Sequence, residues 1–192
     1  FKDKDVSLIA GIDEAGRGPL AGPVVAAAVI LPEDFRAEGL RDSKKVSAPE
    51  REKLFGIISQ NALSIGIGLC TVEEIDQSNI LEATRLAMVR AVDDLSIKPD
   101  LLIIDALRLD RIKIRQEVVI KGDNKSASVA AASIIAKVTR DRLMVELHKR
   151  YPQYGFDKHK GYPTRAHREA IKNHGPCEVH RKSFRLTFEN CL

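Results

Sequence analysis

The sequence predicts an α/β protein in which helices flank a central mixed β-sheet, followed by a helical C-terminal extension. Three observations indicate this class. Short apolar runs at 6–13, 24–31 and 63–70 follow one another near the N-terminus and are typical of strands. Stretches of helical length come next, separated by two more short apolar runs. Glycine and proline between the first two runs favour a hairpin-like turn, so the sheet is expected to begin antiparallel.

The first half of the chain supplies three strands and one early helix. The run 24–31, VVAAAVIL, is apolar throughout and predicts a strand buried on both faces. The run 63–70, LSIGIGLC, predicts a third strand with small residues on one face. Between them, 47–59 is expected to be helical, because Ser47 is a suitable N-cap and Glu50 stands at the capping-box spacing.

The second half alternates helices with strands. Apolar residues repeat at helical spacing over 78–95, and Pro99 ends that region. The short runs 101–106 and 114–120 predict two more strands. The alanine-rich stretch 125–149 is the strongest helix signal, and the sequence offers Asp123 or Asn124 as its cap. A last helix is expected over 164–173, stopped by Gly175 and Pro176.

Length and charge suggest one functional unit with a basic end. The 192 residues are 44% hydrophobic, enough for one sizeable core. We divide the chain into a main body at 1–150 and a basic helical segment at 151–192 packed on it. Ten Lys or Arg and three Asp or Glu give 149–185 a net charge of +7, against +4 for the whole chain. Such a segment suits a polyanionic ligand, although a solvated surface would look the same.

Other features exclude several classes of protein. No apolar run approaches the ~20 residues of a membrane span, and the first residues lack a signal-peptide pattern. The three cysteines, Cys70, Cys177 and Cys191, form no CxxC pair, so neither a zinc knuckle nor a disulfide framework is indicated. We therefore expect a cytoplasmic protein, and the composition favours a monomer.

Acidic residues stand where apolar runs end. Asp13 and Glu14 end the first run, Asp105 ends the fourth, and Asp123 follows the fifth. Carboxylates gathered at strand ends would repel one another, and divalent cations with a preference for oxygen ligands, Mg²⁺ or Mn²⁺, cancel that repulsion. Two such ions about 3.5–4 Å apart can drive phosphodiester cleavage. Singly, Asp123 could be a helix cap, Asp105 a turn residue and Glu14 a solvent-facing side chain; only Asp13 resists such an alternative.

The chain resembles the ribonuclease HII family, the type 2 ribonucleases H, over about residues 8–184. The stretches that carry the resemblance are GIDEAGRGPLAGPVVAAAVIL at 11–31, DSKK at 42–45, IIDA at 103–106, KGDNKSASVAAASIIAKVTRDRLM at 121–144 and HKGYPTRAHREAIKNHG at 159–175. The resemblance implies an RNase H-like fold. It also implies cleavage of RNA in RNA–DNA hybrids and cleavage 5′ to single ribonucleotides in duplex DNA, leaving 3′-hydroxyl and 5′-phosphate ends.

The resemblance also implies roles for particular residues. The four acids, Asp13, Glu14, Asp105 and Asp123, match the metal-binding carboxylates of the family. The substrate-binding residues that it implies are Gly16, Arg17, Gly18, Lys45 and Tyr162.

The expected substrate roles have physical reasons. The 2′-hydroxyl distinguishes RNA from DNA, and the backbone at Gly16 and Gly18 can approach a sugar closely because neither residue has a Cβ. Arg17 can pair with a phosphate. Tyr162 matches the residue that stacks under the sugar at an RNA–DNA junction; taken alone, it would be a half-buried packing tyrosine.

Two features of the sequence leave other interpretations open. His159 and His167 have no carboxylate-rich set around them, so we expect them at the surface or against phosphates rather than on a metal. Clustered acids also occur in integrase-like and junction-resolving nucleases, in non-catalytic hybrid-binding modules and in phosphate-transfer proteins. The motifs typical of these other classes of protein are not evident in this chain.

Overall fold

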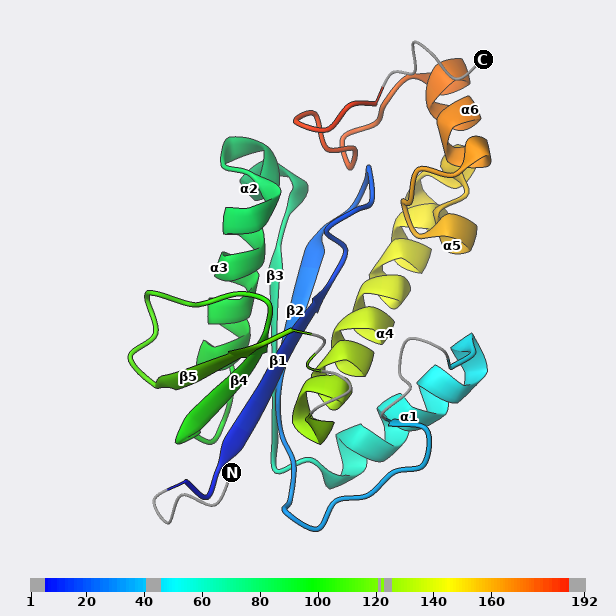
Figure 1. Ribbon diagram of the computed structural model, residues 1–192. Coiled ribbons are helices and arrows are strands. Elements are labelled where there is room, and N and C mark those ends of the chain that lie inside the picture. The colour runs from blue at the N-terminus through cyan, green and yellow to red at the C-terminus, as the bar shows by residue number, and fades with distance from the viewer. Residues whose placement is uncertain (1–5, 41–45, 121, 123–125, 187–192) are drawn as a thin grey trace.

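The computed structural model describes residues 6–40, 46–120, 122 and 126–186, and it arranges them as one twisted sheet with helices on both faces (Figure 1). The sheet has five strands in the order β3-β2-β1-β4-β5. The strands are β1 (Ile9–Ala15), β2 (Val24–Ile30), β3 (Ser64–Cys70), β4 (Leu101–Asp105) and β5 (Arg115–Val119). β2 is antiparallel to β1 and β3, whereas β4 is parallel to β1 and β5. The prediction of a mixed sheet that begins antiparallel is therefore confirmed.

Helices cover the two faces of the sheet unequally. The longer helices are α1 (Ala48–Asn61), α3 (Ile80–Asp93), α4 (Ala127–Arg150) and α6 (Arg165–His174). The short ones are α2 (Val72–Gln77), η3 (Pro152–Tyr154) and α5 (Phe156–His159). α3 packs on one face, and α4 with α1 packs on the other (Figure 1). Within the described part of the chain, no helix is long and apolar enough to span a membrane.

The core explains why the second strand is apolar throughout. All seven residues of β2 are buried, because its Ala26 and Ala28 face α3 while Ala27 and Val29 face α4. α4 also lies very close to β1: a Cβ on Gly11 would stand 2.1 Å from the Ser128 carbonyl carbon. This close approach places one side of α4 directly against the strand that carries the first two acids.

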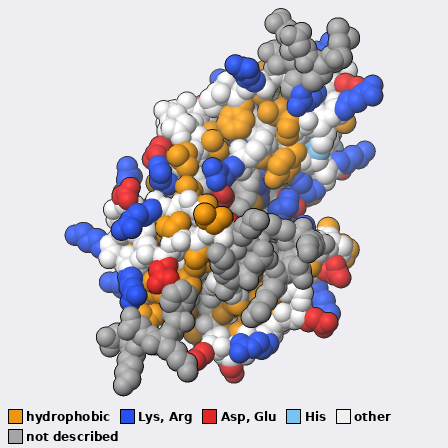
Figure 2. All heavy atoms as spheres, viewed as in Figure 1, with side chains coloured by type: hydrophobic (Ala, Val, Ile, Leu, Met, Phe, Trp, Pro, Cys, Tyr) orange, Lys and Arg blue, Asp and Glu red, His pale blue; other side chains and the backbone are white. Residues whose placement is uncertain are grey.

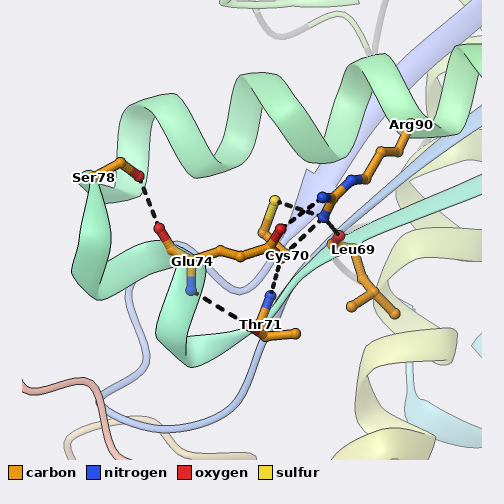
Figure 3. A network of polar contacts seen from close by, with 6 residues as sticks. All are labelled: Leu69, Cys70, Thr71, Glu74, Ser78 and Arg90. Carbon is orange, nitrogen blue, oxygen red and sulfur yellow. Dashed lines mark hydrogen bonds and ion pairs between the residues drawn. The ribbon is translucent and has the colours of Figure 1, made fainter.

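Helix α2 was missed by the sequence analysis, and the predicted helix at 78–95 is shorter than expected. Thr71 caps α2 and accepts a bond from the Glu74 amide, while the Glu74 carboxylate accepts one from the Thr71 amide at 2.9 Å. Glu74 also accepts two bonds from Arg90 of α3, at 2.9 and 2.6 Å, and Arg90 donates to the Leu69 carbonyl (Figure 3). This network fixes the end of β3 to both helices, and the hydrogen bonds from Arg90 lower the pKa of Glu74 to about 2.

The helix ends test the other capping predictions. The Ser47–Glu50 capping box is present at α1, and Gly175 ends α6 as expected. At α4 the prediction is wrong: the N-cap is Ser126, which makes no side-chain capping bond, rather than Asp123 or Asn124. The Ser126 amide, just before α4, donates to the Gly122 carbonyl at 2.8 Å.

The C-terminal segment packs against the loop between β1 and β2. We call residues 16–23 the β1–β2 loop and residues 160–164 the tyrosine loop. The Leu20 amide donates to the Gly161 carbonyl and the Gly22 amide to the Val179 carbonyl, both at 2.8 Å. Ala21 forms an isolated bridge with His180. The β1–β2 loop therefore lies between the tyrosine loop and the chain that follows α6.

Candidate active site

Two acids lie at matching positions near the carboxyl ends of the adjacent parallel strands β1 and β4. The register of β1 and β4 pairs Ile12 with Ile104, and Asp13 and Asp105 follow directly on the two strands. Glu14 is the next residue of β1. Ligand sites of α/β proteins gather at this carboxyl edge of parallel strands. The structure thus brings three of the four predicted acids to one edge.

Asp13 is the most deeply buried of these acids, with 5% of its surface exposed. Its Oδ1 accepts a bond from the Glu14 amide at 2.8 Å, and the Ser133 hydroxyl of α4 also bonds to it. Burial and the adjacent charge of Glu14, with a smaller contribution from Asp105, raise its pKa from 3.8 to about 7. A carboxylate held in this way would be stabilised by a nearby cation.

We expect Asp13→Asn to stabilise the protein in metal-free buffer. Because the folded-state pKa of this acid lies above its unfolded value, its contribution to stability is present below pH 4 and is lost as the pH rises to about 7. The amide is never charged, so at pH 8 the variant should gain on the order of 2–4 kcal/mol in unfolding free energy. Denaturant melts in EDTA at pH 4 and pH 8 measure the gain.

The exposed Asp110 provides the matched control for that experiment. Its side chain is 84% exposed, and Asp110→Asn should change stability little at either pH. If Asp13→Asn unfolds at a lower denaturant concentration than wild type at pH 8, the charge of Asp13 is balanced by favourable interactions within the protein and does not destabilise the fold.

Glu14, the next residue of β1, is partly exposed to solvent and pairs with Arg17. Its side chain is 13% exposed, so the alternative of a fully solvent-facing residue is excluded. Arg17 Nη1 lies 3.3 Å from Glu14 Oε1, and the Arg17 side chain is 42% exposed. Burial raises the pKa of Glu14, and the charge of Arg17 opposes that rise. In this arrangement the partly exposed Arg17 side chain offsets the charge of an acid.

Asp105 contributes charge to the same edge from the next strand. It is half-buried, its Oδ1 accepts a bond from the Gly122 amide at 3.1 Å, and its charge raises the pKa of both Asp13 and Glu14. Asp123 and Lys45 lie outside the described residues. Among the residues that are described, no group of three or more His, Cys, Asp or Glu side chains is arranged to hold a metal ion. The three acids share one edge without forming a closed site.

A cleft of about 370 Å³ opens beside Glu14. Its lining brings together three of the predicted substrate-binding positions of the β1–β2 loop and Tyr162 of the tyrosine loop. The residues that line it are Glu14, Ala15, Gly16, Arg17, Gly18, Arg51, Ser133, Ile134, Lys137 and Tyr162. One acid, a glycine-rich turn and an aromatic ring therefore share a single concave surface.

Gly16 and Gly18 of this turn are glycines for different structural reasons. Gly16 has φ +103°, and a Cβ there would stand 2.1 Å from Arg140 Nε and 2.9 Å from the Pro23 carbonyl oxygen. The Gly16 position is therefore restricted by the protein itself, in addition to the close approach by substrate that the sequence predicts for its backbone. At Gly18 the nearest atom to an added Cβ is Tyr162 Cε1, at 3.7 Å. Only Gly18 has the open space that an approaching sugar would need.

Tyr162 is 41% exposed, and its ring faces the cleft. Its backbone is held by three hydrogen bonds: its amide donates to the His159 carbonyl, and its carbonyl accepts from the Thr164 amide and from His167 Nδ1. Lys137 Nζ lies 5.9 Å from the ring centroid, and Arg140 Cζ lies 6.0 Å from it. A ring exposed at the surface while its backbone is fixed suits stacking on a ligand better than packing in a core.

The expectation that His159 and His167 lie at the surface is wrong for His167. His167 is fully buried and His159 is half-buried, and their rings stack with centroids 4.4 Å apart. His167 Nε2 lies 3.1 Å from Nε2 of the buried His180, whose Nδ1 accepts from the Cys177 amide at 3.0 Å. These bonds require neutral rings, with the proton on Nδ1 of His167 and on Nε2 of His180. Burial lowers the pKa of each to about 4, so both act as neutral supports of the tyrosine loop.

Several residues around the cleft were not predicted from the sequence. Ser133, Lys137 and Arg140 lie at i, i+4 and i+7 on α4, so they share the face that meets the end of β1. Lys137 also pairs with Asp141 at 2.6 Å. Arg51 of α1 lines the opposite side of the cleft and donates to the Val46 carbonyl. Polar residues at helical spacing inside an alanine-rich buried face were the signal that could have found the first three.

Comparison with known proteins supports the family and the fold. The family model for ribonuclease HII matches residues 10–191. The chain belongs to the ribonuclease HII family. A ribonuclease HII of Acetivibrio thermocellus is 60% identical over 181 residues, which cover 94% of this chain and 71% of the relative. Membership of the ribonuclease HII family makes the chain a nuclease of the ribonuclease H type.

Two solved structures support the same fold assignment. The ribonuclease H2 of Pyrococcus horikoshii superposes with a TM-score of 0.80 at 31% identity, covering 94% of this chain and 95% of that one. A ribonuclease HII of Archaeoglobus fulgidus, solved as a complex with PCNA, also gives a TM-score of 0.80, at 28% identity over 96% of this chain and 98% of that one. The RNase H-like architecture expected for a ribonuclease HII is thus confirmed.

Proposed function

We propose that this ribonuclease cleaves the RNA strand of RNA–DNA hybrids and cuts 5′ to single ribonucleotides in duplex DNA, leaving 3′-hydroxyl and 5′-phosphate ends. Its role would be the removal of ribonucleotides from DNA. The observation that carries the proposal is the shared cleft, in which Glu14, the Gly16–Gly18 turn and Tyr162 line one surface beside the buried Asp13. We also infer a monomeric, cytoplasmic enzyme whose C-terminal segment works with the body as one unit.

The acids fit divalent cations by their donor chemistry. Asp13, Glu14 and Asp105 offer carboxylate oxygens at one sheet edge, and burial together with their mutual repulsion raises the pKa of Asp13. We infer that these three, together with Asp123, hold two Mg²⁺ or Mn²⁺ ions. Such ions, when bound, would activate the attacking water and stabilise the leaving oxygen of a phosphodiester. The protein itself contributes by holding Asp13 rigidly through the Glu14 amide and Ser133 and by placing Arg17 and Lys137 beside the cleft.

Recognition of the ribonucleotide is assigned to the two loops that face each other across the cleft. Backbone groups of Gly16, Arg17 and Gly18 would bond to the 2′-hydroxyl, and Tyr162 would stack under the neighbouring deoxyribose. The 3.7 Å between an added Cβ on Gly18 and Tyr162 Cε1 supports this assignment, because both elements border the same space. Lys45 stays a prediction as a phosphate contact.

Tyr162→Ala should reduce cleavage at an isolated ribonucleotide more than cleavage within a long hybrid. Only one register places a lone junction correctly, whereas a hybrid offers many. Stacking on a base is worth about 1–3 kcal/mol, and a sugar contact should fall at or below that range, so we expect up to a tenfold change in the ratio of the two rates. Cleavage rates on both substrates measure the ratio, with Tyr162→Phe as the control that keeps the ring. Equal losses on both substrates would mean that the tyrosine does not recognise the junction.

The basic C-terminal segment should supply affinity without sequence or sugar specificity. Figure 2 shows Lys and Arg side chains over the upper part of this face, where Figure 1 places α5 and α6. Within the basic segment, Lys158, Arg165 and Lys172 are exposed. Replacing all three by Ala should weaken binding to DNA and hybrid duplexes alike. The salt slope on DNA should fall by roughly 0.9 for each phosphate that the variant no longer neutralises.

That prediction has a matched control at the opposite end of the sheet. Lys98 and Lys113 are also exposed, and they flank the beginnings of β4 and β5, away from the edge with the acids. Their double Ala variant should leave the slope unchanged. An unchanged slope in the triple variant of the basic segment would mean that the segment faces away from the duplex.

A comparison of three labelled duplexes tests the proposed function as a whole. One is all DNA, one is an RNA–DNA hybrid and one is DNA with a single ribonucleotide, each incubated with Mg²⁺, with Mn²⁺ or with EDTA. We expect metal-dependent cleavage of the hybrid and cleavage 5′ to the single ribonucleotide, with the all-DNA duplex intact. Equal cleavage of the all-DNA duplex would indicate a DNA nuclease, and binding without cleavage would indicate a hybrid-binding module.

A further inference from the structure

Two fully buried arginines lie behind the cleft, and their hydrogen bonds go to backbone carbonyls of the loops that line it. Arg181 comes from the C-terminal segment. It donates to the Gly22 carbonyl from Nε at 3.0 Å and Nη2 at 2.8 Å, to the Gly16 carbonyl at 2.6 Å and to the Arg17 carbonyl at 3.1 Å. Its own amide donates to the Leu20 carbonyl at 2.8 Å. One guanidinium thus fixes both ends of the β1–β2 loop.

Arg140 connects that loop to the tyrosine loop. From α4 it donates to the Pro23 carbonyl at 2.9 Å, the Ala21 carbonyl at 3.1 Å and the Lys160 carbonyl at 3.0 Å. Lys160 has φ +52°, a left-handed conformation that is unfavourable for a residue with a side chain. The bond from Arg140 helps to hold this conformation two residues before Tyr162.

Stability alone does not explain such an arrangement. Burying a guanidinium costs several kcal/mol even when it is paired, and apolar residues of similar volume often serve a core better. Here the two charges are also close to each other: burial and the charge of Arg140 lower the pKa of Arg181 to about 9, and burial lowers that of Arg140 to about 10. A functional requirement for exact placement of the two loops would explain why two charged side chains are buried here.

We propose that Arg140 and Arg181 are positioning residues that lock the β1–β2 loop and the tyrosine loop into one rigid unit and thereby set the register at which an isolated ribonucleotide is recognised. The inference rests on the proposed function. Recognition of a lone ribonucleotide needs the Gly16–Gly18 backbone and the Tyr162 ring at a fixed separation, and a misplacement of about 1 Å can cost 10²-fold in rate. A long hybrid tolerates looser loops because many registers are available.

The test compares kcat/KM on a duplex with one ribonucleotide and on a long hybrid for Arg140→Lys and Arg181→Lys. Lysine keeps the charge but loses the planar fork that bonds several carbonyls at once. We expect the ratio of single-ribonucleotide to hybrid cleavage to fall tenfold or more in each variant. A smaller folded fraction lowers both rates equally and leaves the ratio unchanged, so the ratio separates positioning from stability. Arg142→Lys is the matched control on the same helix, with a side chain 55% exposed, and should leave the ratio unaltered.

Two kinds of result would overturn the proposal. In folded variants, parallel losses on both substrates, or an equal shift in the Arg142 control, would show that the arginines do not set the register. If the variants do not fold, amide hydrogen exchange on the wild-type protein decides: the Leu20 and Tyr162 amides, which bond to Gly161 and His159, should share one opening free energy. Protection factors that differ more than tenfold would mean that the loops move independently. A wild-type protein that cuts neither duplex would contradict the proposed function, and the exchange result would still decide whether the loops form one unit.

Discussion

Asp13→Asn should abolish cleavage while the fold and duplex binding are retained. The amide keeps the shape of the carboxylate and can still accept the bond from the Glu14 amide, but it has no charge with which to hold a cation. We expect kcat to fall by more than about 10³-fold, equivalent to about 4 kcal/mol of transition-state stabilisation. Single-turnover cleavage of a duplex with one ribonucleotide measures the loss, and gel-shift titration of the same duplex measures binding.

The expected stability of Asp13→Asn distinguishes a loss of activity caused by the active site from one caused by unfolding. Because the same substitution is expected to stabilise the protein in metal-free buffer, loss of activity cannot be attributed to unfolding. Turnover like that of wild type would remove Asp13 from the metal site. Loss of both activity and duplex binding would indicate that Asp13 holds the loop and does not act on the substrate.

Gly16→Ala and Gly18→Ala should fail in opposite ways although they lie two residues apart. At Gly16 the positive φ and the 2.1 Å approach to Arg140 Nε mean that a methyl group must displace the buried guanidinium, so we expect a loss of about 2 kcal/mol or more in stability. At Gly18 the added methyl meets only Tyr162 Cε1 at ordinary contact distance, so stability should stay within about 1 kcal/mol of wild type. The Gly18 variant should still lose tenfold or more in cleavage, because its methyl group occupies the space proposed for the sugar.

Thermal melts and cleavage rates of the two variants check this pair. The Gly18→Ala enzyme should melt like wild type and cleave poorly, whereas Gly16→Ala should melt lower. A Gly18→Ala enzyme with full activity on a single ribonucleotide would show that the sugar does not lie against this position. A Gly16→Ala protein as stable as wild type would show that Arg140 can move aside easily.

Features encoded by local sequence were predictable, and the strands show this well. Apolar runs located all five strands within about three residues at each end, and the Ser47–Glu50 spacing correctly identified the start of α1. Helix α2 carries the same kind of signal in Thr71 and Glu74, but its six residues are too few to show an apolar period. The register of β1 and β4 explains why acids at separate strand ends meet.

Interactions between distant parts of the chain were not predictable from local patterns. Arg181 lies more than 150 residues from the carbonyls that it bonds, and Arg140 more than 100 residues from Pro23 and Ala21, so both resemble ordinary surface charges in the sequence. The His167–His180 pair depends on a turn at Cys177 that brings the two rings together. The need for glycine at position 16 comes from its close contact with the distant Arg140, which the local sequence does not indicate.

We propose that the cleft beside Asp13 and Glu14 recognises a 2′-hydroxyl. The most direct measurement compares wild-type cleavage, with Mg²⁺ and saturating duplex, at one ribonucleotide and at one 2′-fluoro nucleotide in the same sequence. Both duplexes should bind with similar Kd, because phosphate contacts dominate affinity, but only the ribonucleotide should be cut on its 5′ side. Equal cleavage at the 2′-fluoro nucleotide would contradict the account, since the hydroxyl would then play no part in selecting the site.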